Sequence, residues 1–499
     1  MTEPLIYERS IPGRCACFLP AAGVPEVEIP QGFVRADLPL PEVGEADLVR
    51  HYVRLSQVNY GVDTGFYPLG SCTMKYNPKV NEVAAGLPGF TGTHPYQPAY
   101  TVQGNLRLVW KLQEFLKEIG GFAAVSLQPA AGAQGEFTGI HMMRAYHYER
   151  GERQRNVILI PDSAHGTNPA SSSMSGFQVV EVKSDPRGNV DLEDLRSRCD
   201  ESVVGLMLTN PNTLGLFDEN LLAVAALVHG CGGLLYGDGA NMNALLGVAK
   251  PGDMGMDVLH YNLHKTFSTP HGGGGPGSGP VGCSGDLARY LPGPIVARER
   301  SDECPGDVKG HRHTEDCFFY DWVMPGCSIG RVKTFYGHFG VFVRAYTYIR
   351  MLGAAGLRQV AEDAVLNANY LQWKVKDTFR ISHDRRCMHE FVAIGRVEGS
   401  DVRALDICKR LIDYGFHPPT NYFPLIVPEA LMIEPTETES KEMLDAFAEA
   451  LQRIAEEARM QPELLYEAPH KAPVGRLDEV KAARELILRW DGLDPQTGL

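Results

Sequence analysis

A lysine directly before a glycine-rich run is the residue of this sequence with the clearest chemical potential. Lys265 lies in the segment Asn262–Ser268, and the run His271–Gly279 follows it. This order excludes a P-loop, in which Gly-Lys-Ser/Thr comes after the first glycines. An amine beside residues that permit close backbone approach suits condensation with an aldehyde, and pyridoxal phosphate (PLP) is the aldehyde that proteins hold in this way. A surface lysine beside a glycine hinge is the alternative.

An acidic residue lies at the end of an apolar segment upstream of this lysine. Asp238 follows Leu234–Tyr236 and precedes Lys265 by enough residues for another strand and its return. PLP needs a carboxylate beside its ring nitrogen, because only the protonated ring accepts electrons readily. Taken alone, Asp238 would be interpreted as a residue that caps the next helix.

A histidine lies in the turn after another apolar segment. His165 belongs to the stretch Pro161–Pro169, directly after a predicted strand. An imidazole at this place could stack on the face of the cofactor ring opposite Lys265. A purely structural histidine in a turn is the alternative.

Small residues lead into a predicted helix within the stretch Gln128–Glu136. Ala131, Gly132 and Ala133 would expose free backbone N–H groups at the positive end of the helix dipole, which suits a phosphate group. An ordinary helix N-terminus is the alternative. However, the four signals follow one another in the order phosphate turn, stacking His, ring Asp and Schiff-base Lys, and jointly they indicate a PLP enzyme.

Short apolar segments alternate with helical or glycine-rich segments through this part of the chain. The pattern is typical of a mostly parallel sheet with helices on both faces. Ligands of such sheets bind beyond the carboxyl ends of the strands. Thr209 and Ala240, which lie at two of these ends, are therefore further candidates for cofactor contacts. The predicted strands are Val157–Ile160, Val179–Val182, Val203–Thr209 and Gly233–Tyr236.

The remaining sequence predicts three parts. Residues 1–100, rich in Pro, Gly and aromatics, are expected to form an extended arm with one helix near Glu45–Asn59; residues 101–330 form a large PLP-binding α/β domain, and residues 331–499 a smaller C-terminal α+β domain. Apolar residues at helical spacing open the large domain over 105–119. The smaller domain is predicted to contain helices and strands at Tyr346–Trp373, Phe391–Ile394, Val402–Tyr414, Leu431–Glu434 and Glu437–Ala458.

Six longer strings of the sequence match one known family. They are Leu69–Pro78, Gly132–Glu136, His165–Pro169, Asn262–Gly279, Asp413–Pro419 and Glu434–Ser440. On these strings the chain resembles the C-terminal half of the glycine cleavage system P protein family, over nearly its whole length. The resemblance implies a fold-type I, aspartate aminotransferase-like α/β fold and PLP bound covalently to Lys265.

The resemblance also implies a reaction and partners. Glycine would lose its carboxylate as CO2, and the aminomethyl group would pass to the lipoyl group of the H protein. Asp238 would keep the ring protonated, His165 and Lys265 would hold its plane, and Lys265 or His264 would move protons. A homologous partner subunit, with two copies of each chain, would complete the enzyme. Another fold-type I amino-acid decarboxylase or lyase is one alternative, and a non-catalytic structural subunit is another.

Composition excludes several classes of protein. With 47 Lys and Arg against 61 Asp and Glu, the formal net charge of −14 provides no basic surface for nucleic acid. The longest apolar run, Leu221–Val228, is far too short for a membrane span. The acidic N-terminus has no secretory or transit signal, and eleven cysteines without a tight framework indicate reduced thiols, so we expect a cytoplasmic protein.

One stretch does not fit the resemblance. Cys304, His311, His313 and Cys317 have the ligand types of a zinc site, but their spacing matches no standard motif. We predict an exposed insertion loop and no metal, with a zinc site as the alternative.

Overall fold

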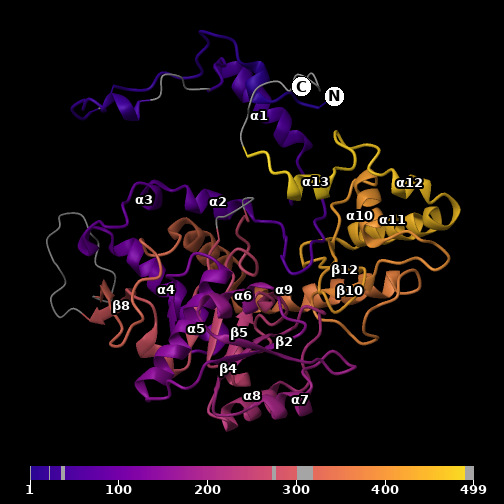
Figure 1. The fold of residues 1–499 in the computed structure, drawn as a ribbon. Helices are drawn as coiled ribbons and strands as arrows, with labels where there is room; N and C mark the ends of the chain where they lie inside the picture. The colour runs from indigo at the N-terminus through magenta and orange to yellow at the C-terminus, as the bar shows by residue number, and fades with distance from the viewer. Residues whose placement is uncertain (1, 22, 35–39, 272–276, 301–317, 489–499) are drawn as a thin grey trace.

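The computed structural model describes residues 2–21, 23–34, 40–271, 277–300 and 318–488. A seven-stranded sheet with the order β1-β7-β6-β5-β4-β2-β3 forms its centre (Figure 1). The strands from β6 to β3 are parallel, and β7 runs antiparallel to both neighbours, β1 and β6. This confirms the predicted mostly parallel sheet. The strands are β1 (Ala124–Ser126), β2 (Val157–Pro161), β3 (Gln178–Val182), β4 (Val203–Thr209), β5 (Leu234–Gly239), β6 (Val258–Tyr261) and β7 (Val281–Cys283).

Successive strand residues point to opposite faces of the sheet, and the side chains on both faces are buried in apolar clusters. On β2, Leu159 belongs to one core cluster, whereas Ile158 and Ile160 belong to another. Residues of α4, α8 and α9 pack into the first cluster, and residues of α5 pack into the second. The helices around the sheet are α4 (Gln103–Gly120), α5 (Gly132–Glu149), α6 (Thr167–Met174), α7 (Leu192–Arg198), α8 (Leu221–Gly230) and α9 (Phe339–Val375).

The C-terminal part packs its own core around a small antiparallel sheet of order β10-β12-β11. The predicted helix over Glu437–Ala458 begins four residues later, at Lys441, because the Ser440 side chain caps the backbone N–H of Met443. The elements here are β10 (Phe391–Ile394), α10 (Ala404–Asp413), β11 (Thr420–Asn421), β12 (Ala430–Ile433), α11 (Lys441–Met460), α12 (Glu463–Tyr466) and α13 (Glu479–Arg484).

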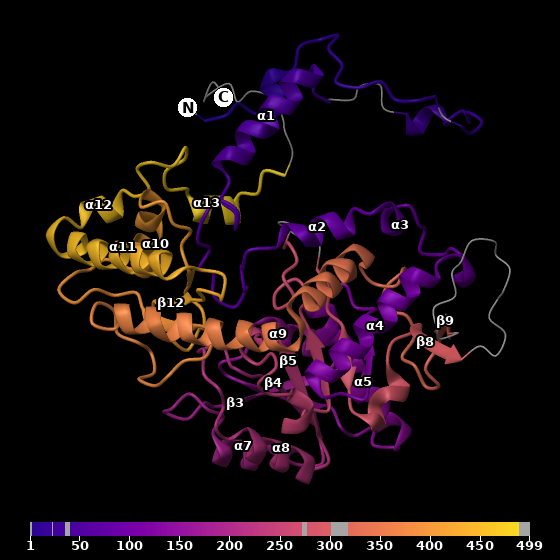
Figure 2. The same ribbon diagram turned by 180° about the vertical axis from the view of Figure 1, so that it is seen from behind.

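The N-terminal arm lies apart from the body, and the chain joins the body only after its first α-helix (Figure 2). Helix α1 (Glu45–Val58) lies where the sequence predicted a helix, away from the central sheet. Two short helices, α2 (Lys79–Ala85) and α3 (Pro88–Thr91), were not predicted. Between α1 and α2, the segment Gly70–Lys75 lies against the body, with Gly70, Thr73 and Lys75 buried. β8 (Ile295–Arg300) and β9 (Phe318–Val323) pair antiparallel in a separate two-stranded sheet.

None of the helices in the described part of the chain combines the length and the apolar character that crossing a membrane requires. The stretch from Cys304 to Cys317, with its alternative zinc site, lies outside the described residues.

Strand β4, which lies inside the sheet between β5 and β2, should be sensitive to cavity formation. Leu206 of β4 is fully buried. We expect Leu206→Ala to lower the free energy of unfolding by about 2–5 kcal/mol, because the substitution leaves a cavity between packed layers. Leu222→Ala on α8, where the side chain is 71% exposed, is the matched control and should change it by about 0.5 kcal/mol or less. Equal losses in urea titrations of the two variants would contradict the assigned packing.

Candidate active site

Three polar residues form a row across the carboxyl ends of neighbouring parallel strands. Thr209 on β4 is in register with Asp238 on β5, and Asp238 is in register with His260 on β6. All three side chains are buried, with Asp238 only 4% exposed. A charged group at this depth is stable only with hydrogen bonds or opposite charge around it. The row therefore marks the strand edge at which the sequence predicted a ligand.

Asp238 accepts a hydrogen bond from its own loop and lies close to an imidazole of β6. The Ala240 backbone N–H donates to Asp238 Oδ1 over 2.9 Å, and His260 Nε2 lies 3.3 Å from the same oxygen. His260 also contacts the hydroxyl of Tyr236 at 2.6 Å and the amide of Asn262 at 2.9 Å. Burial lowers the pKa of His260, so this imidazole is neutral and does not neutralise Asp238.

Glu136 on α5 is a second buried carboxylate near Asp238, and it was not among the predicted site residues. The hydroxyls of Thr167 and Ser171 donate to its two oxygens over 2.7 and 2.8 Å. Burial, together with the charge of Asp238, raises the pKa of Glu136 to about 7. Glu136, Asp238 and His260 each bring one possible metal-ligand atom within 4.8 Å of the others. Glu136 lies in the string Gly132–Glu136 that carried the resemblance, and this string was the signal that could have identified it.

Lys265 lies four residues beyond β6 and points to the Gly70–Lys75 segment. Its Nζ donates a hydrogen bond to the Ser71 carbonyl oxygen over 2.7 Å. The neighbouring His264 is half-buried and accepts a hydrogen bond from the Ser278 backbone N–H at Nδ1 over 3.2 Å. Burial and the nearby Lys265 charge lower the pKa of His264 to about 3. At neutral pH His264 is therefore an uncharged imidazole, which can accept a proton but rarely carries one.

The predicted phosphate turn begins helix α5. Ala131 is the extended residue before the helix, and Gly132 is the first helical residue. A Cβ on Gly132 would lie 2.5 Å from Asn262 Oδ1, so only glycine allows the turn to approach the segment that leads to Lys265. The turn thus places the first free N–H groups of a helix, including that of Ala133, next to this segment.

His165 lies in the exposed turn before α6. Its Nδ1 is 2.9 Å from the hydroxyl of Thr167, which in turn donates to Glu136. Partial burial of its ring and the Lys265 charge lower the pKa of His165. The structure therefore links His165 to the Glu136–Asp238 pair. Arg331 is exposed, and its guanidinium lies 5.5 Å from the centroid of the Tyr336 ring.

The groups of this edge fit the functional groups of PLP. Lys265 offers an amine for the aldehyde, Asp238 a buried anion for a protonated ring nitrogen, and the α5 N-terminus a set of donors for the phosphate. Among the described residues, the buried hydroxyl of Thr209 is one of the polar groups without a hydrogen-bond partner. A buried group of this kind requires a partner, which a cofactor oxygen or nitrogen would provide.

Sequence comparisons place the chain in one family. The profile described as "Glycine cleavage system P-protein" matches residues 36–305, and that described as "Glycine dehydrogenase, C-terminal domain" matches residues 360–470. The chain is 57% identical to a probable glycine dehydrogenase (decarboxylating) subunit 2 of Caldanaerobacter subterraneus subsp. tengcongensis, over 97% of this chain and 98% of that relative. It is 54% identical to the protein of the same description from Thermotoga maritima, over 98% and 100% of the two chains.

Solved structures show the same fold at low sequence identity. A glycine decarboxylase (P-protein) of the glycine cleavage system, in inhibitor-bound form, superposes with a TM-score of 0.71 at 20% identity, over 85% of this chain and 93% of that chain. A glutamate decarboxylase of Lactobacillus brevis superposes with a TM-score of 0.60 at 12% identity, over 89% and 96%. The fold is therefore the predicted fold-type I fold of PLP enzymes. With the two profiles and the long, near-complete matches in agreement, this chain belongs to the glycine cleavage system P-protein family.

Proposed function

We propose that this chain binds PLP covalently on Lys265 and decarboxylates glycine, with transfer of the aminomethyl group to the lipoyl group of the H protein. The observation that carries the proposal is the buried carboxylate of Asp238 on β5. It lies at the edge of the sheet from which the neighbouring strand β6 leads to Lys265. Membership of the P-protein family supports glycine as the substrate, because the matched relatives are described as glycine dehydrogenases.

The residues of the site divide the work of holding the cofactor. When bound, PLP stores the electron pair that the loss of CO2 leaves on the glycine carbon. Asp238 holds a proton on the ring nitrogen, with its carboxylate oriented by the Ala240 N–H. The N–H groups of Ala131, Gly132 and Ala133 bind the phosphate, and the Thr209 hydroxyl donates or accepts one further hydrogen bond.

Proton movement falls to the groups around Lys265. The amine of Lys265, when it is free, would accept or donate a proton at Nζ. His264 is the neighbouring imidazole, but its pKa of about 3 makes it a weaker proton acceptor than the Lys265 amine. His165 lies on the side of Thr167 and Glu136, where its ring can cover one face of the cofactor.

The acceptor completes the balance of the reaction. The carbon of glycine that loses CO2 forms a bond to one sulfur of the lipoyl disulfide, and the S–S bond breaks. The second sulfur takes the electron pair of that bond and one proton, and remains on the lipoyl group as a thiol. Glycine carbon is thereby oxidised and the disulfide is reduced, without any further oxidant.

A homologous partner chain is the second part of the proposal. The relatives are described as subunit 2, which requires a subunit 1 in those proteins. In this chain the N-terminal arm carries apolar side chains in the open, with Phe18 95%, Leu19 88% and Phe33 83% exposed. Apolar side chains gathered on an extended segment are typical of a segment that packs on another chain. We infer that the arm embraces the partner, most simply as two copies of each chain.

Exchange of labelled bicarbonate into the carboxyl group of glycine tests the proposed reaction. We expect exchange with this chain, its partner and the lipoylated H protein together, and little with any of them omitted. Release of free methylamine without H protein would instead indicate an ordinary amino-acid decarboxylase. Absence of both reactions in a complex that contains PLP would contradict the proposal.

The attachment point of the cofactor gives a sharper prediction. Lys265→Ala should abolish covalent attachment while leaving the melting temperature almost unchanged, because the half-buried side chain faces the site rather than the core. Borohydride reduction followed by peptide mapping should find PLP on Lys265 of the unaltered chain. Lys250→Ala is the control, since Lys250 pairs with Glu118 at the surface. Label on Lys75 or Lys250 would show that the site is wrongly assigned.

The arm should be required for assembly. We expect the double variant Phe18→Ser, Leu19→Ser to weaken association with the partner chain, because both exposed side chains would lose apolar burial at the interface. Analytical ultracentrifugation of the co-expressed chains measures the effect. Leu222→Ser changes an exposed leucine of α8, on the opposite side of the molecule from the arm, and should assemble normally (Figure 1). Normal assembly of the arm variant would remove the arm from the interface.

A further inference from the structure

The segment Gly70–Lys75, here called the strap, connects the C-terminal part of the chain to Lys265. At one end it lies on β12: the Gly70 N–H donates to the Met432 carbonyl over 3.3 Å. A Cβ on Gly70 would lie 2.7 Å from that carbonyl oxygen, so glycine is required for this contact. At the next residue of the strap, the Ser71 carbonyl accepts the hydrogen bond from Lys265 Nζ.

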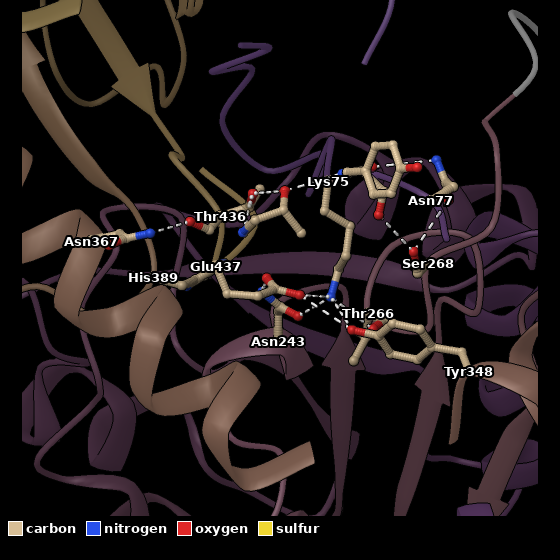
Figure 3. A network of polar contacts seen from close by, with 12 residues as sticks. Lys75, Asn77, Asn243, Thr266, Ser268, Tyr348, Asn367, His389, Thr436 and Glu437 are labelled. Carbon is tan, nitrogen blue, oxygen red and sulfur yellow. Dashed lines mark hydrogen bonds and ion pairs between the residues drawn. The ribbon is translucent and has the colours of Figure 1, made fainter. Parts of the chain in front are cut away.

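The far end of the strap is fixed by a buried ion pair (Figure 3). Lys75 Nζ lies 2.7 Å from Glu437 Oε1, and the side chain of Lys75 is 1% exposed. The same amine donates to Asn243 Oδ1 over 2.7 Å and to the carbonyl of Thr266, the residue after Lys265, over 3.0 Å. Burial alone would lower the pKa of Lys75, but Glu437 and Tyr348 more than compensate and raise it, so Lys75 stays charged.

Two further glutamates hold the backbone between these ends. Glu390, directly before β10, accepts a hydrogen bond from the Ser71 N–H over 2.7 Å. Glu434, directly after β12, accepts one from the Thr73 N–H over 2.8 Å. Both carboxylates are completely buried. The C-terminal part therefore presents two acidic acceptors to two N–H groups of one short segment.

Two residues of the strap between these contacts have a backbone conformation that residues other than glycine rarely adopt. Ser71 has φ 63° and Thr73 has φ 48°, in the left-handed region that favours glycine. A β-branched residue such as Thr73 adopts it only when its surroundings enforce it. The strap would relax to an ordinary conformation without its two carboxylate acceptors, and the Ser71 carbonyl would then move.

Glu390 and Glu434 are not held in place by an ion pair with the nearby His389. His389 is completely buried with Nε2 3.8 Å from Glu390 and 3.9 Å from Glu434, beyond hydrogen-bond distance. Burial lowers the pKa of His389 to about 3, so it is neutral. Burial raises the pKa of Glu434 to about 7, and burial with the charge of Glu434 raises the pKa of Glu390. Two carboxyls at this depth are costly, and the hydrogen bonds that they receive include one strap N–H each.

We propose that Glu390 and Glu434 are positioning residues, which hold the strap so that the Ser71 carbonyl fixes the position of the Lys265 amine. The inference rests on the proposed function only in taking Lys265 as the amine that binds the cofactor. A group held in position by a carbonyl reacts from one orientation, whereas a free lysine side chain samples many rotamers. The C-terminal part of the chain thereby acts on a residue of the central sheet without touching the cofactor.

The test measures how fast Lys265 in the cofactor-free complex reacts with added PLP, followed by absorbance and by borohydride trapping. Glu434→Ala should slow attachment by about tenfold or more, because a displacement of about 1 Å at a reacting group has effects of this size. Glu434→Gln should stay within about twofold of the unaltered chain, since the amide oxygen still accepts the Thr73 N–H. Glu390→Asp keeps the carboxyl group but shortens the side chain by one methylene, and should also slow attachment.

A matched control separates position from stability. Glu429 is 6% exposed and accepts the Ala404 N–H over 2.9 Å in the same C-terminal part, but it does not contact the strap. Glu429→Ala should lower the melting temperature and leave the attachment rate unchanged. Unchanged rates in folded Glu434→Ala and Glu390→Asp, or an equal slowing in Glu429→Ala, would overturn the inference. If Glu434→Ala does not fold, Glu390→Asp decides. Trapped PLP on another lysine would overturn the proposed function instead.

Discussion

The site is organised around the carboxylate of Asp238, which is buried at the end of a central strand. Asp238 is 4% exposed, and His260, the basic side chain in contact with it, is neutral. One N–H donor from Ala240 does not compensate for the removal of a full charge from water. The nearby Glu136 responds with a pKa of about 7, so it gives up its own charge more readily than an exposed glutamate. The site thus has a place for one cation, and a protonated pyridine nitrogen fits it.

The remaining elements bring the other functional groups to that charge. Parallel strands end at one edge, so Thr209, Asp238 and the segment after β6 meet there without any long excursion of the chain. Helix α5 begins at the same edge and supplies donors for an anion. The strap and the C-terminal glutamates then restrict the amine of Lys265. A cationic ring, an anionic phosphate and an aldehyde would each meet a matching group.

Local sequence predicted the parts of the site that belong to single elements. Apolar segments located strands β2 to β5, and helical spacing located α4, because both patterns depend on neighbouring residues alone. The start of α11 was misplaced, since Glu437 fits a helix pattern but forms an ion pair with Lys75 instead. Glu390 could not be identified, because its partner Ser71 lies more than 300 residues away in sequence. Glu434 begins the string Glu434–Ser440 that carried the resemblance, but its hydrogen bond to Thr73, at a similar separation, could not be predicted. Contacts of that range leave no periodicity to detect.

The protonation state of the ring nitrogen shows directly whether Asp238 stabilises a protonated cofactor ring. Nitrogen-15 NMR of the complex loaded with ring-labelled PLP reports whether that nitrogen carries a proton. We expect a protonated nitrogen in the unaltered chain across neutral pH, and an unprotonated one in Asp238→Asn, whose neutral amide cannot stabilise the cation. An unprotonated nitrogen in the unaltered chain, or a protonated one in Asp238→Asn, would contradict this expectation.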